Sequence, residues 1–437
     1  MQNIIKKIII ILIIIIFGLG IYFGYKFYKV SQGDLSDYNT VTNTNPTRTP
    51  FQTRVSTSTQ ANNIQEGEEK SVENPTTNTT KSKLVQIWKE PVSGFDFIYK
   101  DIEEVDTSTN NSTTSVVQAI KNKKVYRNQE FIYLWDRKTG NIYENLASTT
   151  DLNKLSYFTL IGAEEVLFID NISAIIRKVS DDNETISTTY LKLIKDTATS
   201  TLYNANVGNI NISSSNLSLS KETKRLFYFI NNTGTGVLSS FDGGVRTNVL
   251  NTVLSEWLSQ YVNKTTIALT TKPSAYFPGY LFFLNPDGKG KNTYIIGEKY
   301  GFNTLASPDG KKVIYNEIIN NTLETFIYDI KSKTNTYLSQ ATIVDKCVWS
   351  NDSKLIFCGI PQKLYQAPYP EAWYKNNIEF TDNIWSINPV NGEFKLIIPL
   401  QDMVSNSIDI YKIKISNTNK YLLFQDKNSL SLWKYEI

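Results

Sequence analysis

The 437-residue sequence predicts an all-β domain over residues 84–437, and three observations lead to this. Short apolar runs rich in Ile, Val, Tyr, Phe and Trp alternate with turns of Asn, Asp, Gly, Ser and Lys, while helical periodicity is nearly absent. A strand–turn–strand element recurs about every 40 to 45 residues, the length of a four-stranded blade. The last unit has three strands, and a spare strand precedes the first unit. Together these features predict a β-propeller of seven blades, with six or eight as the alternatives.

Residues 1–30 are predicted to form a single transmembrane anchor with its flanks. Residues 8–23 form an unbroken apolar run with lysines on both sides, long enough to cross most of the hydrocarbon of a bilayer. A cleaved secretory signal is the alternative, but no pattern of small residues typical of a cleavage site follows the run. The slight excess of positive charge before the run predicts a cytoplasmic N-terminus at the cell membrane, with the remaining chain outside the cytoplasm.

Residues 31–83 are predicted to form a disordered linker. They consist mainly of Ser, Thr, Asn, Gln and Pro, with few large apolar side chains. Such a segment cannot bury enough apolar surface to offset its loss of conformational entropy on ordering. The linker would raise the propeller domain, residues 84–437, above the membrane.

The repeat consists of a short strand, a turn led by Ser, and a Lys or Arg that opens an apolar strand. Its four copies are residues 219–228, 306–315, 349–357 and 415–424. Ser307 and Ser350 lie 43 residues apart, and Ser220 lies 87 residues before Ser307, with a degenerate copy between them at 263–267. The 66 residues from Ser350 to Ser416 become 44 when the irregular segment 361–382 is treated as an insertion. A single repeating unit therefore explains all four copies.

A second element, an apolar strand followed by an Asp or Asn turn and another strand, occurs at 131–143, 326–334 and 384–393. We expect it to form the third and fourth strands of each blade. The predicted blades are 94–146, 155–204, 210–250, 254–297, 303–338, 344–398 and a last one from 410. The strand missing from the last blade is predicted to be residues 84–88, which would close the ring and leave no open sheet edge.

At these residues the chain resembles the TolB-type, WD-like propeller repeat, whose Ser-Pro-Asp-Gly-Lys signature stands at residues 307–311. The anchor, the linker and residues 136–144 are also similar to membrane-anchored propeller proteins of bacteria. The resemblance implies the propeller fold from about residue 84 to the C-terminus. No activity follows from it.

The insertion carries the predicted ligand-binding loop. It contains Tyr365, Tyr369, Trp373 and Tyr374 together with prolines. Aromatic side chains in an exposed loop supply a large contact area for a sugar or a peptide at low entropy cost. The alternative is that they fold back and cover the neighbouring blades, because large aromatic side chains are usually buried.

The composition argues against several classes of function. The chain has no histidine, which removes the commonest general base and transition-metal ligand, and its net charge of +3 is not clustered. We therefore expect no catalytic residues, no cofactor, no metal site and no binding of nucleic acid. Acidic residues recur at the repeat turns, where Asp binds the backbone rather than a substrate. They are Asp136, Asp309, Asp329 and Asp352.

The two cysteines, Cys347 and Cys358, flank one of the Ser-led turns. A four-residue turn over 350–353 would place Cys347 opposite Ile356 and Cys358 diagonally across the strand pair. A diagonal pair lies about 7 to 8 Å apart, further than the roughly 3.5 to 4.5 Å between Cβ atoms that a disulfide requires. A bridge would need a bulge or another register, although an extracytoplasmic location would permit it.

We therefore expect a membrane-tethered extracytoplasmic propeller that is not an enzyme and that binds a protein, a peptide or a glycan at the cell surface. The alternative is a glycan-active hydrolase or lyase that uses carboxylates and tyrosine. Two facing carboxylates about 5 to 10 Å apart in a deep central pocket would favour that alternative.

Overall fold

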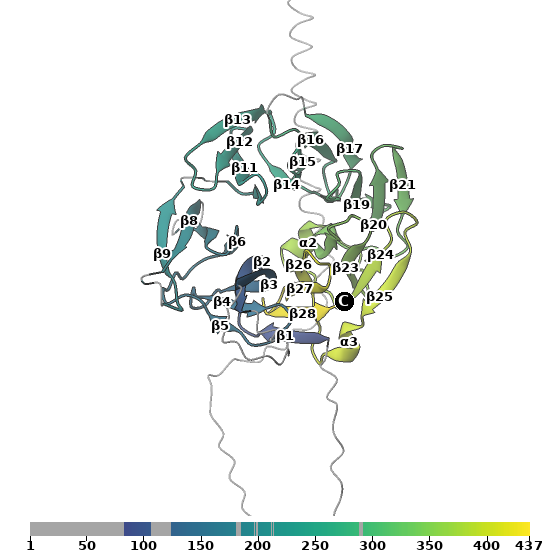
Figure 1. Ribbon diagram of the computed structural model, residues 1–437. Coiled ribbons are helices and arrows are strands. Elements are labelled where there is room, and N and C mark those ends of the chain that lie inside the picture. Colours follow the sequence, from purple (N-terminus) through teal and green to yellow (C-terminus); the bar gives the residue numbers. More distant parts are fainter. Residues whose placement is uncertain are drawn as a thin grey trace, which may run out of the picture. The chain divides into compact units, whose positions relative to one another are not determined.

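The computed structural model describes residues 83–105, 124–180, 185–195, 197, 200–210, 212, 214–287 and 292–437. These residues form seven four-stranded antiparallel sheets that stand as blades around a central axis (Figure 1). The predicted all-β propeller of seven blades is confirmed. The predicted anchor and all but the last residue of the predicted linker lie outside the described residues. Within the described ranges, no helix has the length and apolar character needed to cross a membrane.

The first four blades follow one another along the chain. The first contains β2 (Val92–Val105), β3 (Lys124–Asp136), β4 (Ile142–Leu146) and β5 (Asn153–Lys154). The second contains β6 (Glu165–Phe168), β7 (Ser173–Val179), β8 (Ile186–Ile194) and β9 (Asn204–Asn209). The third contains β10 (Leu217–Ser220), β11 (Arg225–Ile230), β12 (Thr235–Ser240) and β13 (Arg246–Asn251). The fourth contains β14 (Trp257–Asn263), β15 (Thr266–Thr271), β16 (Gly279–Leu284) and β17 (Thr293–Lys299).

The remaining three blades carry the short helices. The fifth contains β18 (Thr304–Ala306), β19 (Lys312–Ile319), β20 (Thr322–Asp329) and β21 (Thr334–Tyr337). The 3₁₀ helix η1 (Val344–Lys346) precedes the sixth, which contains β22 (Cys347–Trp349), β23 (Ile356–Pro361), β24 (Asp382–Ile387) and β25 (Phe394–Ile398). Helix α2 (Glu371–Tyr374) lies between β23 and β24, and α3 (Leu400–Met403) follows β25. The seventh contains β26 (Ile410–Ile415), β27 (Tyr421–Asp426), β28 (Leu432–Glu436) and β1 (Leu84–Trp88).

The ring is closed by strands from both ends of the propeller domain. Strand β1 pairs antiparallel with β28, with Leu84 opposite Tyr435, and the amide of Glu436 donates a hydrogen bond of 3.0 Å to the carbonyl of Lys83. The predicted outer strand, residues 84–88, is confirmed. Closure gives the seventh blade its fourth strand, so β28 is paired on both sides and does not form an open edge.

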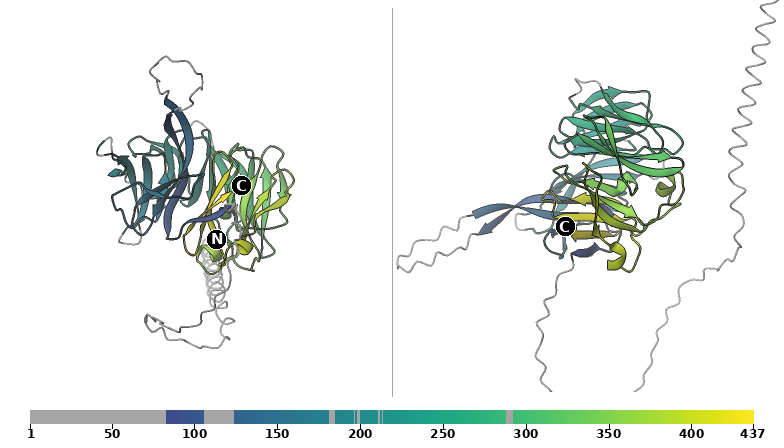
Figure 2. Two further views of the ribbon diagram at one scale, coloured as in Figure 1. Left: turned by 60° about the horizontal axis from the view of Figure 1, so that its bottom comes forward. Right: turned by 90° about the vertical axis from the view of Figure 1, so that its right-hand side faces the viewer.

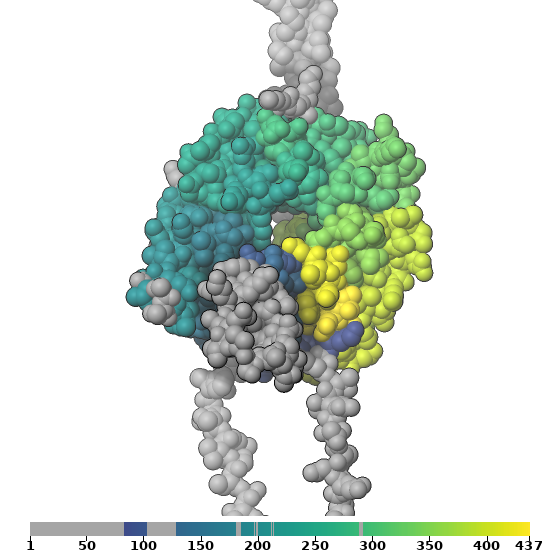
Figure 3. Space-filling model, viewed as in Figure 1, coloured from purple at the N-terminus to yellow at the C-terminus, as the bar shows by residue number. Residues whose placement is uncertain are grey.

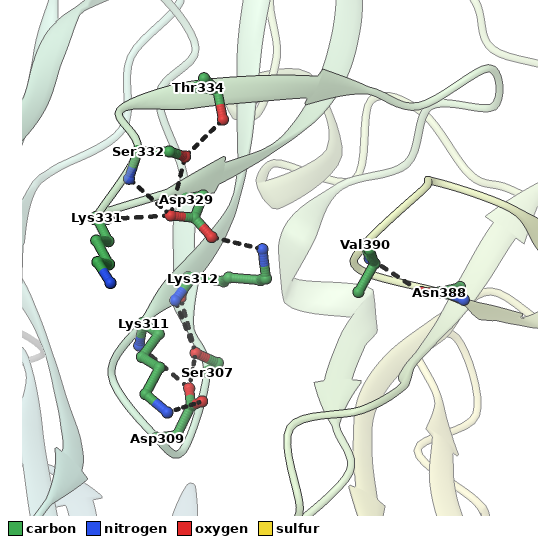
Figure 4. Close-up of polar contacts among 10 residues, drawn as sticks. All are labelled: Ser307, Asp309, Lys311, Lys312, Asp329, Lys331, Ser332, Thr334, Asn388 and Val390. Atoms are coloured by element: carbon green, nitrogen blue, oxygen red, sulfur yellow. Dashed lines mark hydrogen bonds and ion pairs between the residues drawn. The ribbon is translucent and has the colours of Figure 1, made fainter.

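The Ser-led repeat forms the turn between the first and second strands of a blade (Figure 4). In the fifth blade, Ser307 Oγ donates to Asp309 Oδ1 over 2.6 Å and accepts a hydrogen bond of 3.0 Å from the amide of Lys312. In the sixth, Ser350 Oγ donates to Asp352 Oδ1 over 2.7 Å. The degenerate copy behaves in the same way, because Asn263 Oδ1 accepts a hydrogen bond of 3.0 Å from the amide of Thr265 between β14 and β15. The motif therefore recurs because its side chains saturate the backbone of a tight turn.

The Asp residues of the second element also bind the backbone. Asp329 Oδ1 accepts from the amides of Lys331 (3.1 Å) and Ser332 (2.9 Å), and Asp329 Oδ2 accepts from Lys312 Nζ over 2.7 Å (Figure 4). These hydrogen bonds, with that from Lys312 the strongest, hold the pKa of Asp329 well below its usual range. Asp136 accepts a hydrogen bond of 3.1 Å from the amide of its own turn residue 138. The predicted structural role of these acids is confirmed.

One strand assignment was wrong. The second element forms the third and fourth strands in the fifth and sixth blades, as expected, but residues 131–143 form the second and third strands of the first blade. In this blade the first two strands are joined by the long β2–β3 hairpin, in which Val105 pairs with Lys124, and not by a Ser-led turn. The apolar strand of the second element is therefore the second strand of the blade. This hairpin projects from one face of the ring (Figure 2). The sequence did not predict it.

Apolar side chains fill the spaces between adjacent blades. Between the sixth and seventh blades, for example, Ile384 and Ile398 pack with Ile410 and Leu422, and all four are fully buried. Burying an aliphatic side chain of this size contributes about 1.5 to 3 kcal/mol. The two blades predicted without the repeat motif, the second and fourth, have interblade cores of the same kind. The interblade layers therefore hold the sheets in the ring.

The cysteines form a disulfide in the sixth blade, which corrects the predicted register. Cys347 lies directly opposite Cys358, with a Cα–Cα distance of 4.1 Å. The turn spans six residues instead of four, because Ser353 adopts a left-handed conformation (φ 60°) and the amide of Ser350 bonds to the carbonyl of Leu355 over 2.8 Å. The longer turn moves every cross-strand pair by one position along each strand and brings the two sulfur atoms together.

Candidate functional site

A cavity of about 740 Å³ lies at the central axis of the ring. Val92 and Ser93, at the beginning of β2, form part of its wall, whereas the projecting hairpin forms at the other end of the same strand. The cavity therefore opens on the face opposite the hairpin. Further wall residues come from the second, third, sixth and seventh blades, so the cavity exists only because the ring is closed.

The ring is hollowed at its centre on the hairpin face (Figure 3), and the inner strand β2 carries a charge cluster outside the cavity wall. Asp96 in β2 forms ion pairs with Lys221 at 3.1 Å and with Lys414 at 2.9 Å. Burial disfavours the charge of Asp96, but the two lysines outweigh it and lower the pKa of this carboxyl. These three charges therefore satisfy one another and offer a ligand little unpaired charge.

The predicted ligand-binding loop lies on the cavity face, and its four aromatic residues divide into two pairs. Tyr369 and Trp373 are buried, with 1% and 0% of their surface exposed, whereas Tyr365 and Tyr374 are 47% and 44% exposed. Of the exposed pair, Tyr374 lines the cavity. The loop therefore combines a folded-back core with exposed aromatic surface.

The buried aromatic residues fix the insertion to the ring. Tyr369, Trp373 and Phe380 pack against Leu323 and Ile343 of the fifth and sixth blades. Trp373 also lies 6.2 Å, centre to centre, from the ring of Tyr411 in β26, beside which α2 is drawn in Figure 1. The insertion is thus packed against the inner end of the ring.

A second attachment comes from the acidic residue at the start of α2. The carboxylate of Glu371 accepts hydrogen bonds from Ser274 Oγ (2.8 Å) and from the amide of Ala275 (3.1 Å). Ser274 and Ala275 belong to the loop between β15 and β16 in the fourth blade. The insertion therefore reaches from the sixth blade, across the fifth, to the fourth.

Beneath the insertion, Lys346 is held between two buried carboxylates. Lys346 Nζ lies 2.7 Å from Asp382 Oδ2 and 2.5 Å from Asp409 Oδ1, and all three side chains are fully buried. Trp373 Nε1 donates to Asp409 Oδ2 over 3.0 Å, and Lys346 Nζ lies 4.3 Å from the centre of the Phe380 ring. This cluster positions the helix that forms the cavity wall.

Asp382 has an unusual environment within that cluster. Burial raises the pKa of its carboxyl to about 6, Lys346 opposes the shift and Asp409 adds to it. Asp382 Oδ2 also accepts a hydrogen bond of 2.7 Å from the amide of Ile410, whereas Oδ1 has no hydrogen-bond partner in the described part of the chain. The carboxyl is thus partly protonated near pH 6.

In the cavity wall, Asp345 of η1 bonds to two neutral side chains. Asp345 Oδ2 accepts hydrogen bonds from the Tyr374 hydroxyl (2.6 Å) and from Asn303 Nδ2 (2.8 Å). Burial raises the pKa of the Asp345 carboxyl, and the two hydrogen bonds oppose this. Burial and the neighbouring Asp345 raise the pKa of Tyr374 well above 10.

Most other charged residues of the wall are paired with one another. Arg137 forms an ion pair with Glu164. Glu165 accepts from Arg177 at 2.5 Å and lies 3.9 Å from Lys412. These pairs neutralise the side of the cavity formed by the first, second and seventh blades.

Lys427, after β27, forms the wall beside α2. Its Nζ donates to Asn376 Oδ1 and lies 5.1 Å from the centre of the Trp373 ring. Burial lowers the pKa of its ammonium group. No carboxylate of the described residues lies within 4.0 Å of it, although Asp409 and Glu379 lie close enough to act on it electrostatically.

Sequence reasoning identified Tyr374 but missed Asp345, Lys427 and the buried lysine cluster. These residues lie in different blades, and no motif or spacing marks them. Across the described ranges, no group of three or more Cys, Asp or Glu side chains is arranged to hold a metal ion.

Comparisons with known proteins found distant structural similarity alone. No family model matches the chain, and no curated protein matches its sequence. Similar solved structures include the oligogalacturonate lyase of Vibrio parahaemolyticus, with 10% identity over 80% of this chain and 98% of that one and a TM-score of 0.46. TolB from Acinetobacter baumannii has 7% identity over 78% of this chain and 80% of that one, with a TM-score of 0.37. The tricorn protease has 9% identity over 70% of this chain and a TM-score of 0.45, and this chain spans 32% of its length. The propeller fold that the repeat predicted is confirmed by the seven four-stranded sheets themselves.

Proposed function

We propose that this chain is a membrane-tethered extracytoplasmic propeller that binds a peptide, a protein or a glycan in the axial cavity and holds it at the cell surface. The observation that supports the proposal is the cavity of about 740 Å³, whose wall combines tyrosines with positioned charges. This volume falls within the range of roughly 300 to 1,000 Å³ that is usual for ligand sites.

The fixed geometry of the wall favours binding. Tyr374 is held by Asp345, and the helix that carries it is attached through Glu371 to the fourth blade. A site held in advance loses less conformational entropy when a ligand binds. The exposed face of Tyr374 is suited to stacking on a sugar or a peptide side chain.

The charge arrangement favours binding over catalysis. Hydrolysis of a glycosidic bond uses one protonated and one ionised carboxyl group that face the substrate together. In this cavity, Glu164 and Glu165 are engaged by Arg137 and Arg177. A carboxylate that is engaged in an ion pair would first have to leave its partner before it could face a substrate.

A glycan-active hydrolase or lyase remains the second candidate, and Asp345 is the residue that favours it. Its raised pKa is the property expected of a general acid, and Tyr374 and Tyr411 share the same cavity. The two candidates differ in the fate of the ligand. A binding protein returns the ligand intact, whereas an enzyme returns products that mass spectrometry of the released ligand would reveal.

The full chain, purified in mild detergent, can be applied to arrays of defined peptides and glycans, with affinities of the best ligands measured in solution. Tyr374→Ala removes the exposed aromatic wall and is expected to weaken binding about tenfold. Tyr276→Ala is the matched control, because Tyr276 is also exposed (67%) but lies on the β15–β16 loop outside the cavity. Equal affinities of both variants and the unmodified chain would exclude the cavity as the binding site.

A further inference from the structure

Two side chains of the axial cavity carry opposite charges that no ion pair satisfies among the described residues. Asp345 accepts hydrogen bonds from Tyr374 and Asn303 through Oδ2, and no residue of the described ranges donates such a bond to its Oδ1. Lys427 donates to the Asn376 amide. Both charged side chains line the cavity.

These two charges stand apart from the rest of the wall. Arg137, Glu164, Glu165 and Lys412 all take part in ion pairs. A ligand gains little from charges that are already neutralised, because binding it would first require breaking those pairs. Asp345 and Lys427 are therefore the charged groups best able to recognise a ligand.

Burial of Asp345 and of Lys427 favours the binding of an oppositely charged ligand group at both positions. Partial removal from water raises the pKa of Asp345 and lowers the pKa of Lys427, so the charged form of each is disfavoured in the cavity wall. A ligand group of opposite charge would restore the lost electrostatic stabilisation. An ammonium group fits Asp345, and a carboxylate fits Lys427.

The aromatic side chains between the two charges define the rest of the site. Tyr374 contacts Asp345, Trp373 lies against Lys427, and the rings of Trp373 and Tyr374 lie 5.7 Å apart, centre to centre. Both charges thus flank the same helix, α2. A ligand that reached both would lie across this helix and contact the exposed ring of Tyr374.

We propose that the axial cavity binds a zwitterionic ligand, with an ammonium group against Asp345 and a carboxylate against Lys427. This inference rests on the proposed binding function and specifies the ligand chemistry. A short peptide with free ends carries both groups and is the simplest probe, because each added residue extends their separation by at most about 3.3 to 3.6 Å.

The test uses trialanine in four forms: with free ends, N-acetylated, C-amidated, and blocked at both ends. Their affinities for the full chain in detergent are measured by isothermal titration calorimetry at neutral pH. The free peptide is expected to bind about tenfold or more tightly than either singly blocked form, since each block removes a charge-assisted hydrogen bond. Dialanine and tetra-alanine, measured in the same way, establish the preferred separation.

Variants assign each end of the peptide to its partner. Asp345→Asn should abolish the discrimination between the free and the N-acetylated peptide while preserving that between the free and the amidated peptide. Lys427→Met should show the reverse, so each variant also demonstrates that the other half of the site is still folded. Lys354→Met, at an exposed lysine of the sixth blade, removes one positive charge elsewhere and should leave all four affinities unchanged.

Absence of binding by every free peptide at millimolar concentration, or equal binding of the free and blocked forms, would overturn the inference. Binding of a neutral glycan in the cavity would then still support the proposed function. If both variants still bound the free peptide more tightly than the blocked forms, by the same factors as the unmodified chain, the zwitterion would bind elsewhere. That result would overturn the inference as well.

Discussion

The buried carboxyl group of Asp382 makes stability depend on pH in a direction that can be calculated. It ionises at its ordinary value of 3.8 in the unfolded chain and at about 6 in the fold. As pH rises between these values, the unfolded state loses its proton first, and the free energy of unfolding falls. The full change amounts to about 3 kcal/mol, at about 1.4 kcal/mol per pKa unit. About 2 kcal/mol of it falls between pH 4 and pH 6, because the titration of each state extends about one unit to either side of its pKa.

The substitution Asp382→Asn removes this titration. Its asparagine oxygen can still accept from Lys346 and from the amide of Ile410, the contacts that Asp382 Oδ2 makes. The fall in the free energy of unfolding between pH 4 and 6 should therefore be about 2 kcal/mol smaller in the variant. Asp345, whose pKa is also raised, contributes a fall of the same sign to both proteins.

Urea unfolding of the full chain, followed by tryptophan fluorescence at several pH values, measures the slope. Asp242→Asn is the control, because the hydrogen bond from Ser240 lowers the pKa of that exposed carboxyl. A carboxyl group whose pKa is lowered by folding stabilises the fold at pH values above its ordinary pKa, and this stabilisation is lost as the pH falls. The titration of Asp242 therefore lies below about pH 4. Identical slopes for Asp382→Asn and the unmodified chain would refute the reasoning.

Three further predictions concern the ring itself. Lys346→Met leaves two buried carboxylates facing each other and should lower the free energy of unfolding by about 3 to 5 kcal/mol; a loss below about 1 kcal/mol in a urea titration would mean that the carboxyls are neutralised in another way. Reduction of the Cys347–Cys358 disulfide releases a short loop and should lower the free energy of unfolding by about 2 to 3 kcal/mol, compared with the oxidised protein in the same titration. Ser307→Ala removes the side-chain hydrogen bonds of its turn and should lower the thermal midpoint, corresponding to a loss of about 1 kcal/mol; an unchanged midpoint would show that the turn does not depend on them.

Much of the ring was predictable because its unit repeats. The Ser-led turn needs the same side chains in each blade, so its spacing revealed the period, and Leu84–Trp88 was recognised as the strand missing from the last blade. Local backbone conformation was less predictable. The left-handed Ser353 lengthened one turn and aligned the cysteines, and the extended β2–β3 hairpin displaced the strand assignment in the first blade.

The candidate site was predictable only in part. Residue type and the insertion indicated an aromatic loop, but composition cannot tell which rings are buried, and Tyr369 and Trp373 proved to be core residues. Asp345 and Lys427 are 82 residues apart in the sequence, and ring closure brings them to one cavity. Such a site depends on tertiary structure, and no local sequence pattern predicts it.

The accessibility of Lys427 tests most directly whether the axial cavity is the binding site. Acetic anhydride modifies exposed lysines, and mass spectrometry measures its rate at each position of the full chain with and without a bound ligand. We predict that a saturating ligand slows the modification of Lys427 and leaves that of Lys354 unchanged. Equal rates at Lys427 in the free and the ligand-bound protein would contradict the account.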